Sequence, residues 1–105
     1  MNRVTYEQRV QTYTNALIHF GKANQLVVAL EELSEVQKEI CKTMRGDSNL
    51  DHLAEEIADA TIMLEQVRLI FNLNDLVCEK MDEKVKRLDY RLKGVSGDED
   101  RCAAQ

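Results

Sequence analysis

Residues 50–71 read LDHLAEEIADATIMLEQVRLIF and predict a helix of about six turns. This helix is apolar nearly all the way round, because Ile57 and Phe71 follow one side at helical spacing while Ile62 and Ile70 cover another. A helix with so little polar surface is buried on more than one side. Since one chain of this length provides little cover, we expect a homodimer or a homotetramer with this helix near the interface.

Three further helices are predicted around this stretch. They cover residues 5–20, 24–45 and 75–92. Thr5 and Gln8 have the spacing of a capping box at the first helix, Gly21 interrupts the chain after it, and Ser48 or Asn49 can cap the helix that begins at residue 50. We therefore expect an all-α fold of four helices, bundle-like and completed by homo-oligomerisation.

The composition supports a single helical domain with a polar tail. The 105 residues are 44% hydrophobic and 31% charged, and they include no proline and only four glycines. We expect the folded domain to span residues 1–93 and a flexible polar tail to span residues 94–105. Three cysteines without metal-type spacing argue against a disulfide framework and favour a cytoplasmic location.

Charge and hydropathy argue against two classes of partner. The net charge of −5 is unfavourable for a nucleic-acid-binding surface. No apolar run approaches the roughly 18 residues of a membrane span, and we recognise no signal peptide. We therefore expect neither a nucleic acid nor a membrane as a partner.

Two short acidic motifs mark the second and third predicted helices. Glu31, Glu32 and Glu35 fall on the second helix, and Glu56 and Asp59 fall on the third. Glu56 lies in the middle of an apolar stripe, where an ionised carboxylate is costly without a positive partner. If the two helices pack antiparallel through their apolar stripes, Glu32, Glu35, Glu56 and Asp59 converge. Four acidic oxygen donors suit a hard divalent cation, and we expect Mg²⁺.

Further charged residues flank these motifs. Glu39 lies two turns after Glu32, and His52 lies one turn before Glu56. We expect both side chains to contact the metal ligands without binding the metal themselves. The last helix carries a basic stripe, formed by Lys80, Lys84, Arg87 and Arg91. A basic stripe facing a metal cluster suits phosphate chemistry, whereas lysines at the rim of a core are the simpler interpretation of the stripe alone.

The paired motifs resemble those of the MazG-type all-α nucleoside triphosphate pyrophosphohydrolases, in the MazG-like and dimeric dUTPase superfamily. That family carries Glu-Glu-x-x-Glu followed, after a variable spacer, by Glu-x-x-Asp. The corresponding residues here are Glu31-Glu32-Leu-Ser-Glu35 and Glu56-Ile-Ala-Asp59, with twenty residues between Glu35 and Glu56. The resemblance covers most of the expected folded part, from about residue 24 to residue 91.

This resemblance implies an enzyme that cleaves the bond between the α- and β-phosphates of a (deoxy)nucleoside triphosphate, releasing the monophosphate and pyrophosphate in nucleotide-pool clearance. It implies Mg²⁺ as the cofactor, with Mn²⁺ as a substitute, and a homodimer or homotetramer. The implied roles are metal binding by Glu32, Glu35, Glu56 and Asp59, activation of water by Glu35 or the neighbouring Glu31 or Glu32, and phosphate contact by Lys84 and Arg87.

Two other functions remain open from the sequence. Phosphoribosyl-ATP pyrophosphatase of histidine biosynthesis has a similar acidic pattern. A non-catalytic helical dimer that binds a cation through the same carboxylates is the alternative outside the enzymes. Release of pyrophosphate in the presence of Mg²⁺ separates the enzymes from the non-catalytic dimer.

Overall fold

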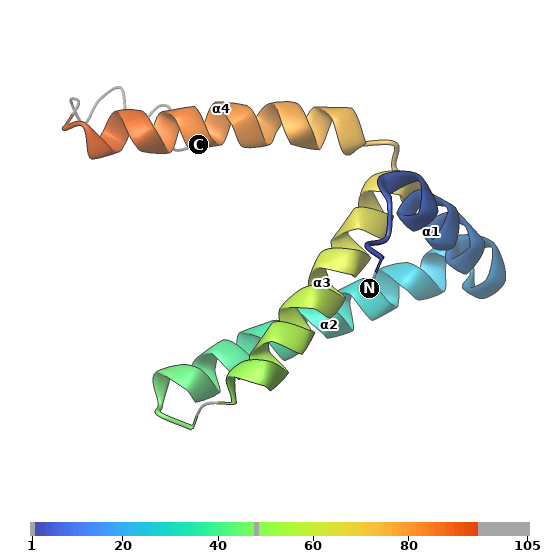
Figure 1. Ribbon diagram of the computed structural model, residues 1–105, viewed down its shortest axis with the longest axis horizontal. Coiled ribbons are helices and arrows are strands. Elements are labelled where there is room, and N and C mark those ends of the chain that lie inside the picture. Colours follow the sequence, from blue (N-terminus) through green and yellow to red (C-terminus); the bar gives the residue numbers. More distant parts are fainter. Residues whose placement is uncertain (1, 48, 95–105) are drawn as a thin grey trace. The chain divides into compact units, whose positions relative to one another are not determined.

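The computed structural model describes residues 2–47 and 49–94, and every regular element in these two ranges is a helix (Figure 1). The helices are α1 (Tyr6–Phe20), α2 (Lys22–Met44), α3 (Leu50–Ile70) and α4 (Asn74–Leu92). The all-α class and the four predicted helices are confirmed. None of these helices is long and apolar enough to cross a lipid bilayer. The predicted tail lies, from residue 95 on, outside the described residues.

The helix ends follow from local chemistry. The Thr5 side chain accepts a hydrogen bond from the Gln8 amide, and the Gln8 side chain accepts one from the Thr5 amide, which completes the predicted capping box. Gly21 alone separates α1 from α2, with φ at +89°, a backbone conformation that glycine adopts without a steric penalty. The Asn49 side chain caps α3 by accepting from the His52 amide at 3.1 Å.

Helices α2 and α3 form an antiparallel hairpin that holds most of the packing (Figure 1). Its buried apolar positions are Ala29 on α2 and Ala60 and Met63 on α3. Two of these three residues are alanines, and small side chains allow two helix backbones to approach closely. The antiparallel packing on which the expected convergence of the acidic motifs depends is thus present in the structure.

A buried amide pair fixes the register of this hairpin. Gln25 donates to Gln66 at 2.8 Å, and both side chains are almost fully buried. Gln66 also donates to the sulfur of Met63 at 3.6 Å. Sliding either helix by a turn would leave these buried amides without partners, at a cost of about 1–3 kcal/mol each. The pair thus sets which residues of α2 and α3 face each other further along the hairpin.

Helix α1 packs against both helices of the hairpin and shares one compact unit with them, Met1–Asn72. Helix α4 belongs to a second unit, Leu73–Gln105, and none of its residues from Asn74 to Leu92 is buried. The apolar stripe of α4 includes Met81, Val85 and Leu88, each more than half exposed. The single domain of residues 1–93 remains a prediction.

Candidate functional site

Three carboxylates from α2 and α3 converge on one side of the hairpin. Glu32 comes from α2, and Glu56 and Asp59 come from α3. One carboxylate oxygen of each lies within 4.8 Å of the other two. Glu32 and Glu56 are half-buried, whereas Asp59 is exposed. The structure therefore brings together three of the four residues predicted as metal ligands, with one open side toward solvent.

The register of the hairpin explains this convergence. Glu32 lies two turns after Gln25 on α2, and Asp59 lies two turns before Gln66 on α3. Because the helices run antiparallel, the hydrogen-bonded glutamines place Glu32 and Asp59 at one common level of the hairpin. Glu56 follows one turn further back on α3 and joins the same cluster.

The cluster is electrostatically strained without a cation. Burial raises the pKa of Glu32, and the negative charges of Asp59, Glu56, Glu35 and, least, Glu31 raise it further. The neighbours that shift this pKa are therefore all carboxylates. A divalent cation among these oxygens would lower the pKa values of the carboxylates, because its positive charge stabilises their ionised forms.

The fourth predicted ligand, Glu35, lies outside the group of three but remains close to it. It is half-buried, one turn after Glu32 on α2, and its charge contributes to the raised pKa of Glu32. Glu35 lies one turn after Glu32 on α2, and Glu56 lies one turn before Asp59 on α3. Because the two helices are antiparallel, Glu35 and Glu56 lie at the same level of the hairpin. Glu31, the other residue predicted to activate water, is exposed.

The two predicted supporting residues lie next to the cluster and contact each other. His52 Nε2 is 3.3 Å from Glu39 Oε1 and 3.6 Å from Glu56 Oε1. Glu39 is only 4% exposed, although it carries a charge. Its burial results from the same register, which sets Glu39 of α2 opposite His52 of α3.

The predicted phosphate contacts lie on α4. Lys84 is exposed and Arg87 is half-exposed. Neighbouring side chains pair within the helix, with Lys80 Nζ 3.4 Å from Glu83 Oε2. Such an exposed pair contributes little to stability. Because α4 belongs to the second unit, the roles of Lys84 and Arg87 remain predictions.

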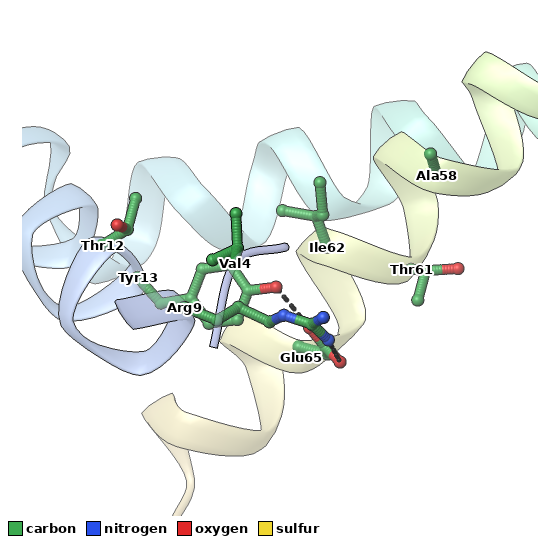
Figure 2. Close-up of a pocket in the computed structure, with 8 residues that line it drawn as sticks. All are labelled: Val4, Arg9, Thr12, Tyr13, Ala58, Thr61, Ile62 and Glu65. Atoms are coloured by element: carbon green, nitrogen blue, oxygen red, sulfur yellow. Dashed lines mark hydrogen bonds and ion pairs between the residues drawn. The ribbon is translucent and has the colours of Figure 1, made fainter. Parts of the chain in front are cut away.

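A second polar cluster, which the sequence did not indicate, joins α1 to α3 (Figure 2). The Tyr13 hydroxyl donates to Glu65, and Arg9 Nη1 lies 3.2 Å from Glu65 Oε2. Both contacts line a pocket of about 510 Å³ with largely apolar walls. Glu65 lies nine residues after Glu56, about 180° round the helix. The pocket is therefore on the side of α3 opposite the acidic cluster.

This second cluster predicts a dependence of stability on alkaline pH. Burial and the hydrogen bond to Glu65 raise the pKa of Tyr13 from 10.0 to about 12, although Arg9 acts in the opposite direction. The stabilisation by the protonated phenol is complete below pH 10 and is lost as the pH rises from 10 to about 12. Tyr13→Phe should therefore lower the free energy of unfolding by about 2 kcal/mol near pH 8 and flatten its alkaline decline. Urea unfolding of both proteins at several pH values measures this, and parallel pH profiles would contradict it.

Comparisons of the chain with models of known protein families, with curated proteins and with solved structures found no match in any of the three. The geometry of the acidic cluster is thus the basis for assigning a function.

Proposed function

We propose that the protein is a Mg²⁺-dependent nucleoside triphosphate pyrophosphohydrolase that converts a (d)NTP to the (d)NMP and pyrophosphate. The observation that carries this proposal is the convergence of Glu32, Glu56 and Asp59, from two helices, within 4.8 Å. The Glu-Glu-x-x-Glu and Glu-x-x-Asp motifs that resemble the MazG type supply these residues, and nucleotide-pool clearance is the role that this resemblance implies.

The donor set fits the cation. Glu32, Glu56 and Asp59 would hold Mg²⁺, with Glu35 as the fourth carboxylate, and Mn²⁺ would be accepted by the same oxygens. The raised pKa of Glu32 supports this assignment, because crowded carboxylates that disfavour ionisation gain most from a cation. When bound, Mg²⁺ supplies charge neutralisation at phosphoryl oxygens and lowers the pKa of a coordinated water.

The remaining residues of the chain orient the reactants in this proposal. Glu35 or Glu31 would accept the proton of the attacking water, and Glu35 has the better position, since it is half-buried beside Glu32 while Glu31 is exposed. Lys84 and Arg87 would contact the phosphates of the substrate, as the resemblance implies.

We also propose that the chain acts as a homodimer or homotetramer. Ile57, Ile62 and Leu64 of α3 are each more than 40% exposed in the single chain, and Phe71 after the helix is 56% exposed. Burial of a large apolar side chain contributes about 1.5–3 kcal/mol. Association with a second copy of the chain would bury several of these side chains at once. Light scattering at micromolar concentration should give a mass of two or four chains, and a mass of one chain would contradict the proposal.

The function is tested by the products formed from phosphoribosyl-ATP and from a panel of canonical and modified NTPs and dNTPs, with Mg²⁺ and with EDTA. We expect pyrophosphate and a nucleoside monophosphate from one or a few substrates, and only with Mg²⁺. Release from phosphoribosyl-ATP alone would favour the histidine-biosynthesis enzyme. No release from any of these compounds, by a folded protein that binds Mg²⁺, would favour the non-catalytic metal-binding dimer.

A further inference from the structure

A buried carboxylate lies directly behind the acidic cluster. Glu39 is 4% exposed, and an ionised carboxylate at such depth is costly unless it is paired. Its Oε1 atom lies 3.5 Å from Lys42 Nζ and 3.3 Å from His52 Nε2. Both partners remain partly exposed, so Glu39 is the fixed member of this group.

His52 connects Glu39 to the cluster. Its Nε2 atom lies between two carboxylates, 3.3 Å from Glu39 Oε1 on α2 and 3.6 Å from Glu56 Oε1 on α3. Its Nδ1 atom is 3.8 Å from Glu55, whose side chain is 75% exposed. The Nε2 atom therefore faces a carboxylate on each helix, and the buried Glu39 limits where the ring can turn.

This connection reaches a carboxylate of the proposed metal site. The Glu56 side chain is 13% exposed, its Oε1 atom lies 3.6 Å from His52 Nε2, and one of its carboxylate oxygens belongs to the cluster with Glu32 and Asp59. A glutamate side chain has three torsions, and a contact to one of its oxygens restricts the rotamers that the whole carboxylate can adopt. In metal sites generally, hydrogen-bonded groups behind the ligands orient them and raise the affinity for the metal.

We propose that Glu39 and His52 are positioning residues that hold Glu56 in the orientation required for cation binding. The inference rests on the proposed metal site, and it adds to that site a carboxylate–imidazole–carboxylate chain running from the core of the hairpin to the ligand. A purely structural role for His52, as a link between α2 and α3, is the alternative that the experiment must exclude.

The experiment measures the affinity of the full-length protein for Mn²⁺ by electron paramagnetic resonance of the free ion. His52→Ala should weaken binding by about 10–100-fold, since it removes the group that orients Glu56. His52→Gln should remain within about threefold of wild type, because the glutamine amide nitrogen reaches the position of Nε2. His52→Asn, whose amide is shorter, should weaken binding as His52→Ala does.

A charge-matched pair separates positioning from simple electrostatics. Glu39→Gln and Glu55→Gln each remove one negative charge from a partner of His52. Glu39→Gln should weaken Mn²⁺ binding by about tenfold, whereas Glu55→Gln should change it by less than about threefold. Circular dichroism and thermal unfolding in EDTA establish that the variants are folded. If His52→Ala does not fold, the comparison of His52→Gln with His52→Asn replaces it as the test.

The outcomes are distinct. Wild-type affinity in His52→Ala, or equal losses in His52→Gln and His52→Ala, would overturn the inference, because a nitrogen donor at Nε2 is what it requires. Mn²⁺ binding with the expected variant pattern but without pyrophosphate release would refute the proposed enzymatic activity and leave the inference intact. No Mn²⁺ binding by the wild-type protein would overturn both.

Discussion

Glu56→Gln and Asp59→Asn should each reduce Mg²⁺-dependent pyrophosphate release by at least about a hundredfold while the protein stays helical. Each change keeps the size of the side chain but removes one charged oxygen donor from the group of three that lies within 4.8 Å. Coordination of a phosphoryl group by a metal stabilises the transition state by several kcal/mol, and about 1.4 kcal/mol corresponds to a factor of ten. Steady-state rates together with far-UV circular dichroism measure both effects.

Glu55→Gln is the matched control for this loss of activity. Glu55 is adjacent to Glu56 in sequence, but its side chain is 75% exposed and lies outside the group of three. The control variant should keep nearly the full rate, because its carboxylate is solvated and contributes little to the site. Full activity in both Glu56→Gln and Asp59→Asn would refute the assignment of the ligands.

Saturating Mg²⁺ should raise the melting temperature of the wild-type protein by about 10 °C or more. A cation at a hundred times its dissociation constant stabilises the folded state by about 2.7 kcal/mol, and 1 kcal/mol corresponds to about 4–8 °C in a domain of this size. Repulsion among the crowded carboxylates lowers the stability of the cation-free protein, as the raised pKa of Glu32 indicates. Thermal unfolding in Mg²⁺ and in EDTA, at matched ionic strength, measures the shift.

Glu32→Gln should raise the melting temperature in EDTA but reduce the stabilisation that Mg²⁺ provides. A raised pKa means that Glu32 favours the folded state while protonated, at low pH, and that this advantage is lost as the pH rises through the folded-state value. The substitution removes the charge that repels Asp59 and Glu56, so the variant should melt a few degrees higher than wild type in EDTA at neutral pH. It should also lose most of the Mg²⁺-induced shift. A variant that melts lower in EDTA but retains the shift would contradict this account of the cluster.

The helices and their ends were predictable because local chemistry determines them. Thr5 with Gln8, Gly21 and Asn49 each satisfy or interrupt backbone hydrogen bonds within a few residues of sequence. The convergence of Glu32 with Glu56 and Asp59 was predictable for a related reason. Antiparallel packing through two apolar stripes leaves few registers that bury both stripes, and helical spacing then places the acidic motifs at one level.

Other features depend on contacts far apart in the sequence and were not predictable from it. Glu39 is charged and is flanked by Lys38 and Lys42, so local sequence does not indicate that it is buried; its burial follows from the register set by Gln25 and Gln66. The contact between Tyr13 and Glu65 depends on how α1 packs on α3, and each residue alone resembles an ordinary surface or core position.

The proposed activity and the proposed roles of Glu39 and His52 both require that the cluster of Glu32, Glu56 and Asp59 binds a divalent cation. The most direct test is to add substoichiometric Mn²⁺ to ¹⁵N-labelled protein and to map which backbone amide signals broaden. We predict that broadening begins at residues flanking Glu32, Glu56 and Asp59 and that excess Mg²⁺ reverses it. Broadening that is absent, or that spreads evenly over exposed carboxylates such as Asp75 and Glu79 of α4, would contradict the claim.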